Sequence, residues 1–396
     1  MSLDTALADP AEVGMSPARL EDAAALMQRQ YDTGRSPTLV AVVARHGRVV
    51  FTHAVGEHRP GGPAVTTDSI FPLASQTKPM TAAVLLCLVE RGLVGLNEPI
   101  TVHLPELEGQ GHDEVMVNSL LTHTSGWHED DFLARVDERL DDVIAGWSPG
   151  GRSLLDEILL TPCFETPRRE VPGVIMQYCN LNYTLLGEII RRVTGDSLDA
   201  AMRRHLFEPL AMTSSAVIVP DDWADRVIGR PPGIPFGPEH PDSPIAFDDP
   251  LWAKSDDGAS GVHATAVDAL RFAQMILDRG LAGGRRVLSG DAVRVMTTDQ
   301  VPGIAAEVLG MHRPEARWGY GYAVTGTAPW LRFGGATVAV GSLRHGGAGG
   351  IDVWIDPSTG VVGVYFEVVT EWSDEVGPVS WAAHRFEDVV TAAVVG

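Results

Sequence analysis

The chain has 396 residues, of which 44% are hydrophobic, so it is long enough to bury one large core or the cores of two domains. It carries 30 basic and 52 acidic residues, and the formal charge of −22 disfavours nucleic acid or an anionic membrane surface as a partner. A small neutral molecule is the partner that this composition accommodates best.

The N-terminal residues carry no export signal, because Asp4 and Asp9 precede Ala11 without any basic residue or long apolar run. No stretch reaches the roughly 20 consecutive apolar residues that a membrane-spanning helix needs. We therefore expect a cytoplasmic protein that does not bind a membrane.

The cysteines and histidines predict no metal site. Cys87, Cys163 and Cys179 are scattered and form no CxxC pair, so we expect reduced thiols, with Cys87 in the core. His123 and His128 stand five residues apart around a glycine, unlike the paired ligands of a helical zinc site. We expect neither a metal nor another cofactor.

The first predicted elements are a helix and a hairpin. Ser16 followed by Pro17 and by apolar residues at helical spacing predicts a helix over residues 16–33. Two β-rich runs, 38–44 and 49–52, flank a short turn that contains a glycine, which predicts a β-hairpin.

The stretch Ser75-Gln76-Thr77-Lys78 lies where a loop turns into an apolar run, which predicts the start of a helix. Ser75 and Lys78 would then share one helix face. A hydroxyl becomes a good nucleophile when a neighbouring group takes its proton, and N–H groups at a helix start can bind an oxyanion. The pattern therefore indicates an activated serine, although it also fits a capping serine followed by a solvated lysine.

Residues 75–257 are predicted to be mostly helical. Helices are expected at 183–193 and 198–207, and the Pro-rich segment 220–254 is expected to be a long surface loop. That loop fits either a binding lid or a purely structural connection.

A second serine motif, Gly146-Trp147-Ser148-Pro149-Gly150, matches the Gly-x-Ser-x-Gly pattern. The nucleophile elbow that carries this pattern needs a strand before the serine and a helix after it. Residues 137–145 have a helical pattern instead, so we interpret the motif as a coincidental loop.

Tyr178-Cys179-Asn180 is expected in a non-helical link, from which the tyrosine could move a proton and the amide could hold a polar group in one cleft. By itself the triplet also fits a core tyrosine and a helix-capping asparagine. His345-Gly346-Gly347-Ala348 is expected at a turn, where glycines let a ligand approach the backbone and an N–H can serve an oxyanion hole.

The C-terminal part changes to a β pattern. Runs at 337–344, 351–356 and 361–369 are expected to be strands, separated by turns at 345–350 and 356–360, and residues 372–395 are expected to close as a helix. Together with the N-terminal hairpin they predict an α+β fold, in which one antiparallel sheet is built from both ends of the chain.

The three motifs Ser75–Lys78, Tyr178–Asn180 and His345–Gly347, in this order and at these separations, resemble those of the serine β-lactamase-like superfamily. That superfamily includes class C β-lactamases, D-Ala-D-Ala carboxypeptidases and family VIII carboxylesterases. The resemblance extends to residues 120–126 and 185–187, and it spans about residues 15 to 390.

The resemblance implies a β-lactamase/DD-peptidase-like fold with an active site between two domains. Residues 1–74 and 258–396 would form a discontinuous domain with the antiparallel sheet flanked by helices, and residues 75–257 the mostly helical domain.

The resemblance also assigns roles to residues. Ser75 would be the acylated nucleophile, Lys78 and Tyr178 the proton-transfer pair, and Asn180 a contact of substrate or lysine. The backbone N–H groups of Ser75 and Ala348 would form the oxyanion hole, and either Lys78 or Tyr178 could be the general base.

The sequence departs from the resembled peptidases and lactamases at the third motif, which is His345-Gly346-Gly347 instead of Lys-Thr-Gly. The missing lysine helps to bind a substrate carboxylate, whereas an unperturbed histidine is mostly neutral at pH 7. We therefore expect a serine carboxylesterase that acts on short-chain esters. The alternatives are an acyltransferase, which segment 341–372 also resembles, an amidase or β-lactamase, and a non-catalytic binding protein.

Overall fold

A six-stranded antiparallel sheet combines strands from both ends of the chain. In spatial order these are β11 (Ala323–Val324), β12 (Leu343–Gly347), β13 (Ile351–Asp356), β14 (Val361–Glu367), β1 (Thr38–Arg45) and β2 (Arg48–Gly56). The computed structural model describes residues 3–109, 111–239, 245–308, 310–328, 334–373, 377–378 and 381–396. The predicted α+β fold with one antiparallel sheet is confirmed.

Both faces of this sheet are buried. Along β1, Leu39, Ala41 and Val43 point to one face, and Val40 and Val42 point to the other, because side chains alternate along a strand. Every residue of β1 is buried, and so is every residue of β13 and β14. A sheet this apolar on both sides needs a layer of helices on each face.

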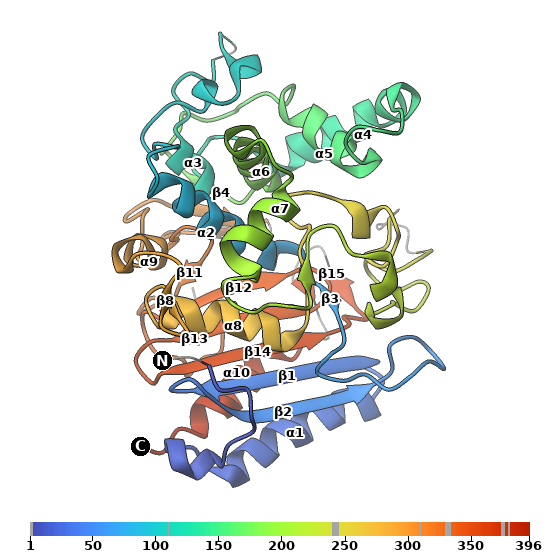
Figure 1. Ribbon diagram of the computed structural model, residues 1–396, viewed down its shortest axis with the longest axis vertical. Coiled ribbons are helices and arrows are strands. Elements are labelled where there is room, and N and C mark those ends of the chain that lie inside the picture. The colour runs from blue at the N-terminus through green and yellow to red at the C-terminus, as the bar shows by residue number, and fades with distance from the viewer. Residues whose placement is uncertain are drawn as a thin grey trace.

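The described residues form helices α1 (Pro17–Asp32), α2 (Thr77–Val89), α3 (Val117–Leu121), α4 (Glu129–Gly146), α5 (Leu154–Cys163), α6 (Asn180–Thr194), α7 (Leu198–Met202), α8 (Ala266–Leu277), α9 (Gly290–Thr297) and α10 (Ala383–Ala392). Helices α1 and α10 pack against each other on one face of the sheet, and α8 covers the other face (Figure 1). Helices α3 to α6 lie at the opposite end of the molecule from α1, and α2 runs between them and the sheet (Figure 1).

Most predicted elements are found near their expected limits. Ser16 caps α1 by accepting a hydrogen bond from the N–H of Arg19 at 3.4 Å, and Pro17 is the first helical residue. The hairpin is β1–β2, whose turn includes Gly47 at φ 76°.

The structure corrects three of the predicted elements. β12 begins at Leu343 and contains His345 to Gly347, so the strand predicted at 337–344 starts late and the turn predicted at 345–350 shrinks to the residues after Gly347. The helix predicted at 198–207 becomes a π-helix after Met202. Within the helix predicted at 372–395, α10 covers residues 383–392, and β15 (Trp372–Ser373) and β16 (Gly377–Pro378) come before it; residues 374–376 and 379–380 of that prediction lie outside the described part of the chain.

Helix α9 was not predicted, and neither were several short strands. These are β3 (Phe71–Pro72), β4 (Met176–Gln177), β5 (Ser215–Ala216), β6 (His263–Ala264), β7 (Leu281–Ala282), β8 (Arg285–Arg286), β9 (Ala306–Val308), β10 (Met311–Arg313) and β11 of the main sheet. Most have only two residues, too few for a period-two pattern to be visible in the sequence.

The described part of the chain contains no helix that is both long and apolar enough to cross a bilayer.

The segment 220–254 was predicted to be a long loop. Its described residues are mostly irregular and contain two short 3₁₀ turns, Asp221–Arg226 and Trp252–Lys254, and residues 240–244 lie outside the described part. The division into domains at residues 74/75 and 257/258 stays a prediction.

Gly363 of β14 provides a test of the sheet packing. It lies opposite Trp354 of β13, and a Cβ at this position would overlap the buried indole of Trp354. We expect Gly363→Ala to lower the free energy of unfolding by about 1 to 3 kcal/mol, measured by urea denaturation, because overpacking forces neighbouring side chains from their preferred positions.

The control is a double-mutant cycle with Trp354→Leu. Because the smaller side chain leaves room for the added methyl group, Gly363→Ala should destabilise the Trp354→Leu protein less than the wild type. Strictly additive effects of the two substitutions would contradict this account.

Candidate active site

Ser75 lies at the start of the central helix, as predicted. The 3₁₀ turn Ala74–Gln76 leads directly into α2, and Ala74 has φ 46°, a left-handed conformation that an alanine adopts only under strain. Pro79 lies in the first turn of α2, where a missing N–H leaves no helical hydrogen bond unmade. This turn leaves Ser75 partly exposed while Lys78, three residues later, is fully buried.

Lys78 makes three hydrogen bonds. Its Nζ lies 3.0 Å from Ser75 Oγ, 2.7 Å from Asn180 Oδ1 and 3.0 Å from the carbonyl oxygen of Ala259. The amide and peptide oxygens can only accept, so they occupy two N–H groups. The third position, toward Ser75, can be an N–H of the ammonium or the lone pair of the neutral amine, and the second case would let Lys78 take the serine proton.

Tyr178 and Asn180 reach the same place from another part of the chain. Tyr178 follows β4, and its ring lies 5.0 Å from Lys78 Nζ. Asn180 is the first residue of α6 and not part of a fully non-helical link, so its side chain is fixed by the helix start. The structure thus brings Ser75, Lys78, Tyr178 and Asn180 together.

His345 of β12 completes the group, and its hydrogen bonds define its tautomer. Nδ1 lies 2.6 Å from the carbonyl oxygen of Gly321, which can only accept, so Nδ1 carries the proton. Nε2 then presents its lone pair to the hydroxyl of Tyr178 at 3.3 Å, and that hydroxyl donates. Burial lowers the pKa of His345 to about 3, and the nearby charge of Lys78 contributes to that lowering, so the imidazole is neutral.

The glycines of the third motif let β12 approach the serine. A Cβ on Gly347 would overlap the carbonyl oxygen of Leu73, so glycine is needed where this strand lies next to the segment before Ser75. Ala348 follows β12 and lines the same cavity as Ser75. The oxyanion roles predicted for the N–H groups of Ser75 and Ala348 stay predictions.

The cavity that contains Ser75 has a volume of about 180 Å³ and a mostly apolar lining. The lining residues are Ser75, Tyr178, Val308, Trp318, Ala323, Arg344, His345, Gly346, Gly347, Ala348, Trp372 and Trp381. Arg344 is the permanently charged residue among them, but its guanidinium pairs with Asp352 at 2.7 Å and Glu387 at 3.2 Å. That charge is therefore committed to two buried carboxylates.

Sequence reasoning missed two residues of the site. The ring of His123 stacks on that of Tyr178 with centroids 4.5 Å apart, and burial lowers its pKa well below the ordinary value. Glu129, the first residue of α4, accepts hydrogen bonds from the backbone N–H and the side-chain amide of Asn180. The only signal was their position in and just after the segment 120–126 that carries the resemblance.

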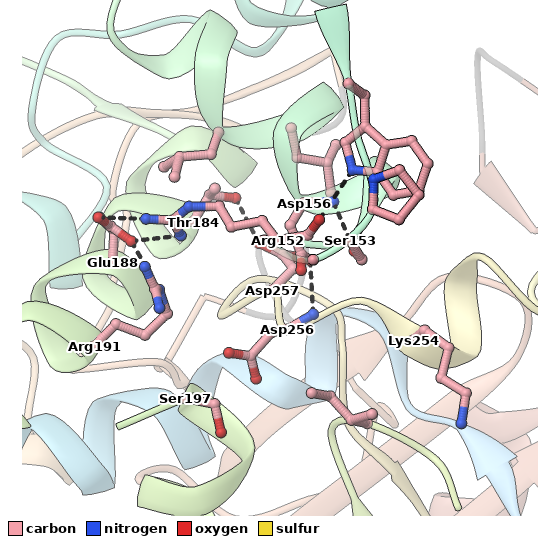
Figure 2. Close-up of a pocket in the computed structure, with 17 residues that line it drawn as sticks. Arg152, Ser153, Asp156, Thr184, Glu188, Arg191, Ser197, Lys254, Asp256 and Asp257 are labelled. Carbon is pink, nitrogen blue, oxygen red and sulfur yellow. Dashed lines mark hydrogen bonds and ion pairs between the residues drawn. The ribbon is translucent and has the colours of Figure 1, made fainter. Parts of the chain in front are cut away.

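A larger cavity of about 460 Å³ lies among α5, α6 and the segment 254–257 (Figure 2). In Figure 2 the side chains of Arg152 and Arg191 both turn toward Glu188, which lies 2.8 Å from Arg152 and 3.0 Å from Arg191 as an ion-pair partner of both. Asp257 also lines this cavity, and accepts a hydrogen bond from the N–H of Ala259, whose carbonyl binds Lys78. The larger cavity therefore adjoins the site without containing Ser75.

The competing serine motif has no such surroundings. α4 ends at Gly146, and Ser148 is exposed in the irregular segment that follows, so no strand precedes it. The prediction of a coincidental loop is confirmed by this geometry, because a nucleophile elbow requires a strand before the serine.

A partly exposed serine next to a buried lysine and a tyrosine, on this framework of sheet and helices, is the arrangement of the β-lactamase-like serine hydrolases. Residues 23–377 match the Beta-lactamase family, and the chain belongs to that family.

Two curated relatives share 31% identity with the chain. One is esterase EstB from Burkholderia gladioli, over 354 residues, 81% of this chain and 83% of EstB. The other is penicillin-binding protein 4 from Amycolatopsis lactamdurans, over 271 residues, 67% of this chain and 65% of that protein. The chain thus spans slightly less than two thirds of penicillin-binding protein 4.

Solved structures confirm the fold. The hydrolase EstCE1, described as having promiscuous acyltransferase activity, superposes with a TM-score of 0.71 at 20% identity, covering 96% of this chain and 98% of EstCE1. A family VIII carboxylesterase superposes with a TM-score of 0.70 at 18% identity, covering 96% and 97%. The predicted β-lactamase/DD-peptidase-like fold is therefore confirmed.

The neutral state of His345 leads to a prediction about acid stability. The pKa of His345 is about 3 in the folded protein, below the ordinary 6.5, so neutral His345 contributes its full stabilisation above pH 6.5 and that stabilisation is lost as the pH falls toward 3. Between pH 6.5 and 4.5 the histidine binds a proton in the unfolded state but stays neutral in the folded state. This difference lowers the free energy of unfolding by about 2 to 3 kcal/mol over that pH range.

His345→Gln keeps an acceptor for Tyr178 and a donor for Gly321 but does not titrate. We expect its free energy of unfolding, measured in urea at both pH values, to fall by about 2 to 3 kcal/mol less than that of the wild type. Burial also lowers the pKa of His263 and His384 to about 4, but both residues are present in both proteins and their effect cancels. An equal fall in the two proteins would contradict the neutral His345.

Proposed function

We propose that the protein is a serine carboxylesterase that hydrolyses short-chain neutral esters through an acyl-Ser75 intermediate. The observation that carries the proposal is the 3.0 Å hydrogen bond between Lys78 Nζ and the Oγ of Ser75, a residue that lines an apolar cavity. The 31% identity with esterase EstB, over most of both chains, supports it.

In acylation, Lys78 acts as the amine and takes the proton of the Ser75 hydroxyl, while the serine oxygen forms a bond to the ester carbonyl carbon. The carbonyl oxygen becomes an oxyanion, which the N–H groups of Ser75 and Ala348 bind. The resulting Lys78 ammonium keeps Asn180 and the Ala259 carbonyl as acceptors, so the buried positive charge is accommodated.

Collapse of the tetrahedral intermediate breaks the bond to the alcohol oxygen. Tyr178 gives its hydroxyl proton to the leaving alkoxide and regains one from the Lys78 ammonium, which returns Lys78 to the amine. Water then attacks the acyl-serine, and the same groups move protons in the reverse direction. Before the reaction the Tyr178 hydroxyl donates to the Nε2 lone pair of neutral His345, and its O–H turns from His345 to the alkoxide to deliver the proton.

The cavity favours uncharged substrates. Its lining is dominated by Val308, Trp318, Trp372 and Trp381, which suit an apolar acyl or alcohol group. Among the described lining residues the one permanent cation, Arg344, is already paired with two carboxylates. A substrate carboxylate would therefore lose its hydration without gaining a partner.

The nucleophile is tested by Ser75→Ala. We expect the rate of p-nitrophenyl acetate or butyrate hydrolysis to fall by at least about 10³-fold, because the acyl-enzyme route is lost. Intact-protein mass spectrometry should find an acyl mass on wild-type Ser75 and none on the variant. Ser148→Ala is the matched control and should hydrolyse these esters as the wild type does.

Wild-type rates in Ser75→Ala would exclude Ser75 as the nucleophile. Failure of a fluorophosphonate to label the wild type at all would favour a non-catalytic binding protein.

Charge selectivity is tested with paired substrates. For a neutral ester and the same ester carrying a carboxylate near the scissile bond, we expect kcat/KM to be at least about tenfold higher for the neutral one, because an unpaired carboxylate costs at least about 1.4 kcal/mol in an apolar site. The chromogenic cephalosporin nitrocefin, which carries a carboxylate, should likewise be a poor substrate. Preference for the anionic member of the pair would contradict the proposed substrate class.

A second candidate function is acyl transfer to an alcohol. The specific observation that favours it is the tryptophan-lined cavity, since an apolar lining can hold an alcohol beside the acyl-serine in place of water. The promiscuous acyltransferase activity described for EstCE1, which shares the fold, is consistent with this candidate. Hydrolysis in the presence of added short-chain alcohols, with both products quantified, distinguishes transfer from hydrolysis.

A further inference from the structure

The carboxylate of Glu129 lies directly behind Asn180. Glu129 Oε2 accepts the backbone N–H of Asn180 at 2.7 Å, and Glu129 Oε1 accepts the Asn180 side-chain amide at 2.5 Å. One N–H donor on each oxygen suits the ionised carboxylate, which can only accept. The pair of bonds holds the Asn180 side chain at two points.

These bonds determine which way the Asn180 amide faces. Because the carboxylate accepts only, the NH₂ end of the amide must point to Glu129, and Oδ1 must then point to Lys78 Nζ, 2.7 Å away. A flipped amide would place its NH₂ group against the Lys78 nitrogen and its oxygen against the carboxylate. A continuous chain of hydrogen bonds therefore runs from Glu129 through Asn180 and Lys78 to Ser75.

We propose that Glu129 is a positioning residue for the serine reaction: through Asn180 it aims Lys78 at Ser75 and stabilises the positive charge that Lys78 gains. The inference rests on the proposed function in that it treats Lys78 as the group that takes the serine proton. The arrangement is analogous to a nucleophile, a base and a third group that orients the base.

The other groups around this chain do not compete for the role. Glu129 faces the thiols of Cys163 and Cys179, and burial raises the pKa of both thiols well above the ordinary value, so they stay neutral. Lys78 also faces the rings of Tyr178 and Tyr183 and the two buried histidines, His123 and His345.

Both histidines are held neutral, since burial and then the charge of Lys78 lower the pKa of each. Burial raises the pKa of Glu129, while the two hydrogen bonds from Asn180 and the charge of Lys78 lower it again in part. Glu129 is thus the negatively charged residue that is joined to Lys78 through this chain of hydrogen bonds.

Glu129→Gln tests the proposal. Glutamine has nearly the same shape, but its NH₂ meets an N–H of Asn180 and favours the flipped amide, which no longer accepts from Lys78. We expect kcat for ester hydrolysis to fall by about 10- to 100-fold, as is typical when a group that orients a reacting residue is removed, with a smaller change in KM.

The pH profile separates positioning from a merely structural role. Loss of a nearby negative charge makes the neutral Lys78 amine easier to reach, so the acid limb of kcat/KM should move to lower pH in Glu129→Gln. Glu188→Gln is the matched control, because Glu188 is likewise a glutamate of the helical part, but it is ion-paired with arginines and lines the larger cavity. It should lower the thermal midpoint and leave the pH profile unchanged.

A double-mutant cycle with Asn180→Ala tests the route. If Glu129 acts through Asn180, Glu129→Gln should have little further effect on kcat in the Asn180→Ala protein. Full additivity of the two substitutions, or a Glu129→Gln enzyme with wild-type kcat and pH profile, would overturn the proposal. A lower kcat with an unshifted acid limb would also overturn it, since that is the result expected of a structural residue.

The rate of Ser75 labelling by a fluorophosphonate, followed by mass spectrometry, keeps this test separate from the ester proposal. The probe reports the nucleophilicity of Ser75 without any ester, so slower labelling of Glu129→Gln with a shifted pH dependence supports positioning even if no ester is turned over. Equal labelling rates in wild type and Glu129→Gln overturn it. No labelling of wild-type Ser75 overturns both proposals together.

Discussion

The site depends on a buried lysine whose hydrogen bonds join three separate parts of the chain. Lys78 is fully buried in α2, where an ammonium without partners would be unstable by several kcal/mol. Its hydrogen-bond partners come from the turn that begins α2, from the start of α6 and from the segment before β6. Because each partner fixes one direction around Nζ, the nitrogen can lie only where it faces Ser75.

The sheet supplies the other side of the site and sets its electrostatics. β12 lies against the Ser75 segment because Gly347 has no side chain, and this approach brings His345 to the hydroxyl of Tyr178. The carbonyl of Gly321 then fixes the tautomer that leaves Nε2 free to accept. A lysine at position 345 would add a second cation close to Lys78, whereas buried neutral histidine adds none. The histidine in the third motif therefore makes the charge of the site less positive than a lysine would.

Much of this arrangement could be predicted because the relevant signals are local. Ser16 before Pro17, and Ser75 three residues before Lys78, depend on spacing within one helical turn, and the structure has both helix starts where these residues place them. The sheet could be inferred because β1 and β14 contain unbroken apolar runs, at 39–44 and 361–366. The placement of β12 was wrong because glycines at 346 and 347 signal a turn in the sequence, while here they permit close packing within a strand.

Glu129 could not be found from sequence because its partner Asn180 lies 51 residues away and the hydrogen bonds form only after α4 and α6 pack. In the sequence it is one of three acidic residues that begin α4. Acidic residues are common at that position because their negative charge interacts favourably with the positive end of the helix dipole. The next residue along the chain illustrates the difference: Asp130 is exposed, whereas burial raises the pKa of the Glu129 carboxyl.

Burying a carboxylate costs free energy because the group loses its hydration, and hydrogen bonds from the protein offset part of that cost. The two hydrogen bonds that Glu129 accepts both come from Asn180, the residue that binds Lys78. An uncharged residue at 129 would avoid this loss of hydration, but it would also leave the amide of Asn180 free to turn over. The buried charge is thus best explained by the direction that it imposes on its neighbour.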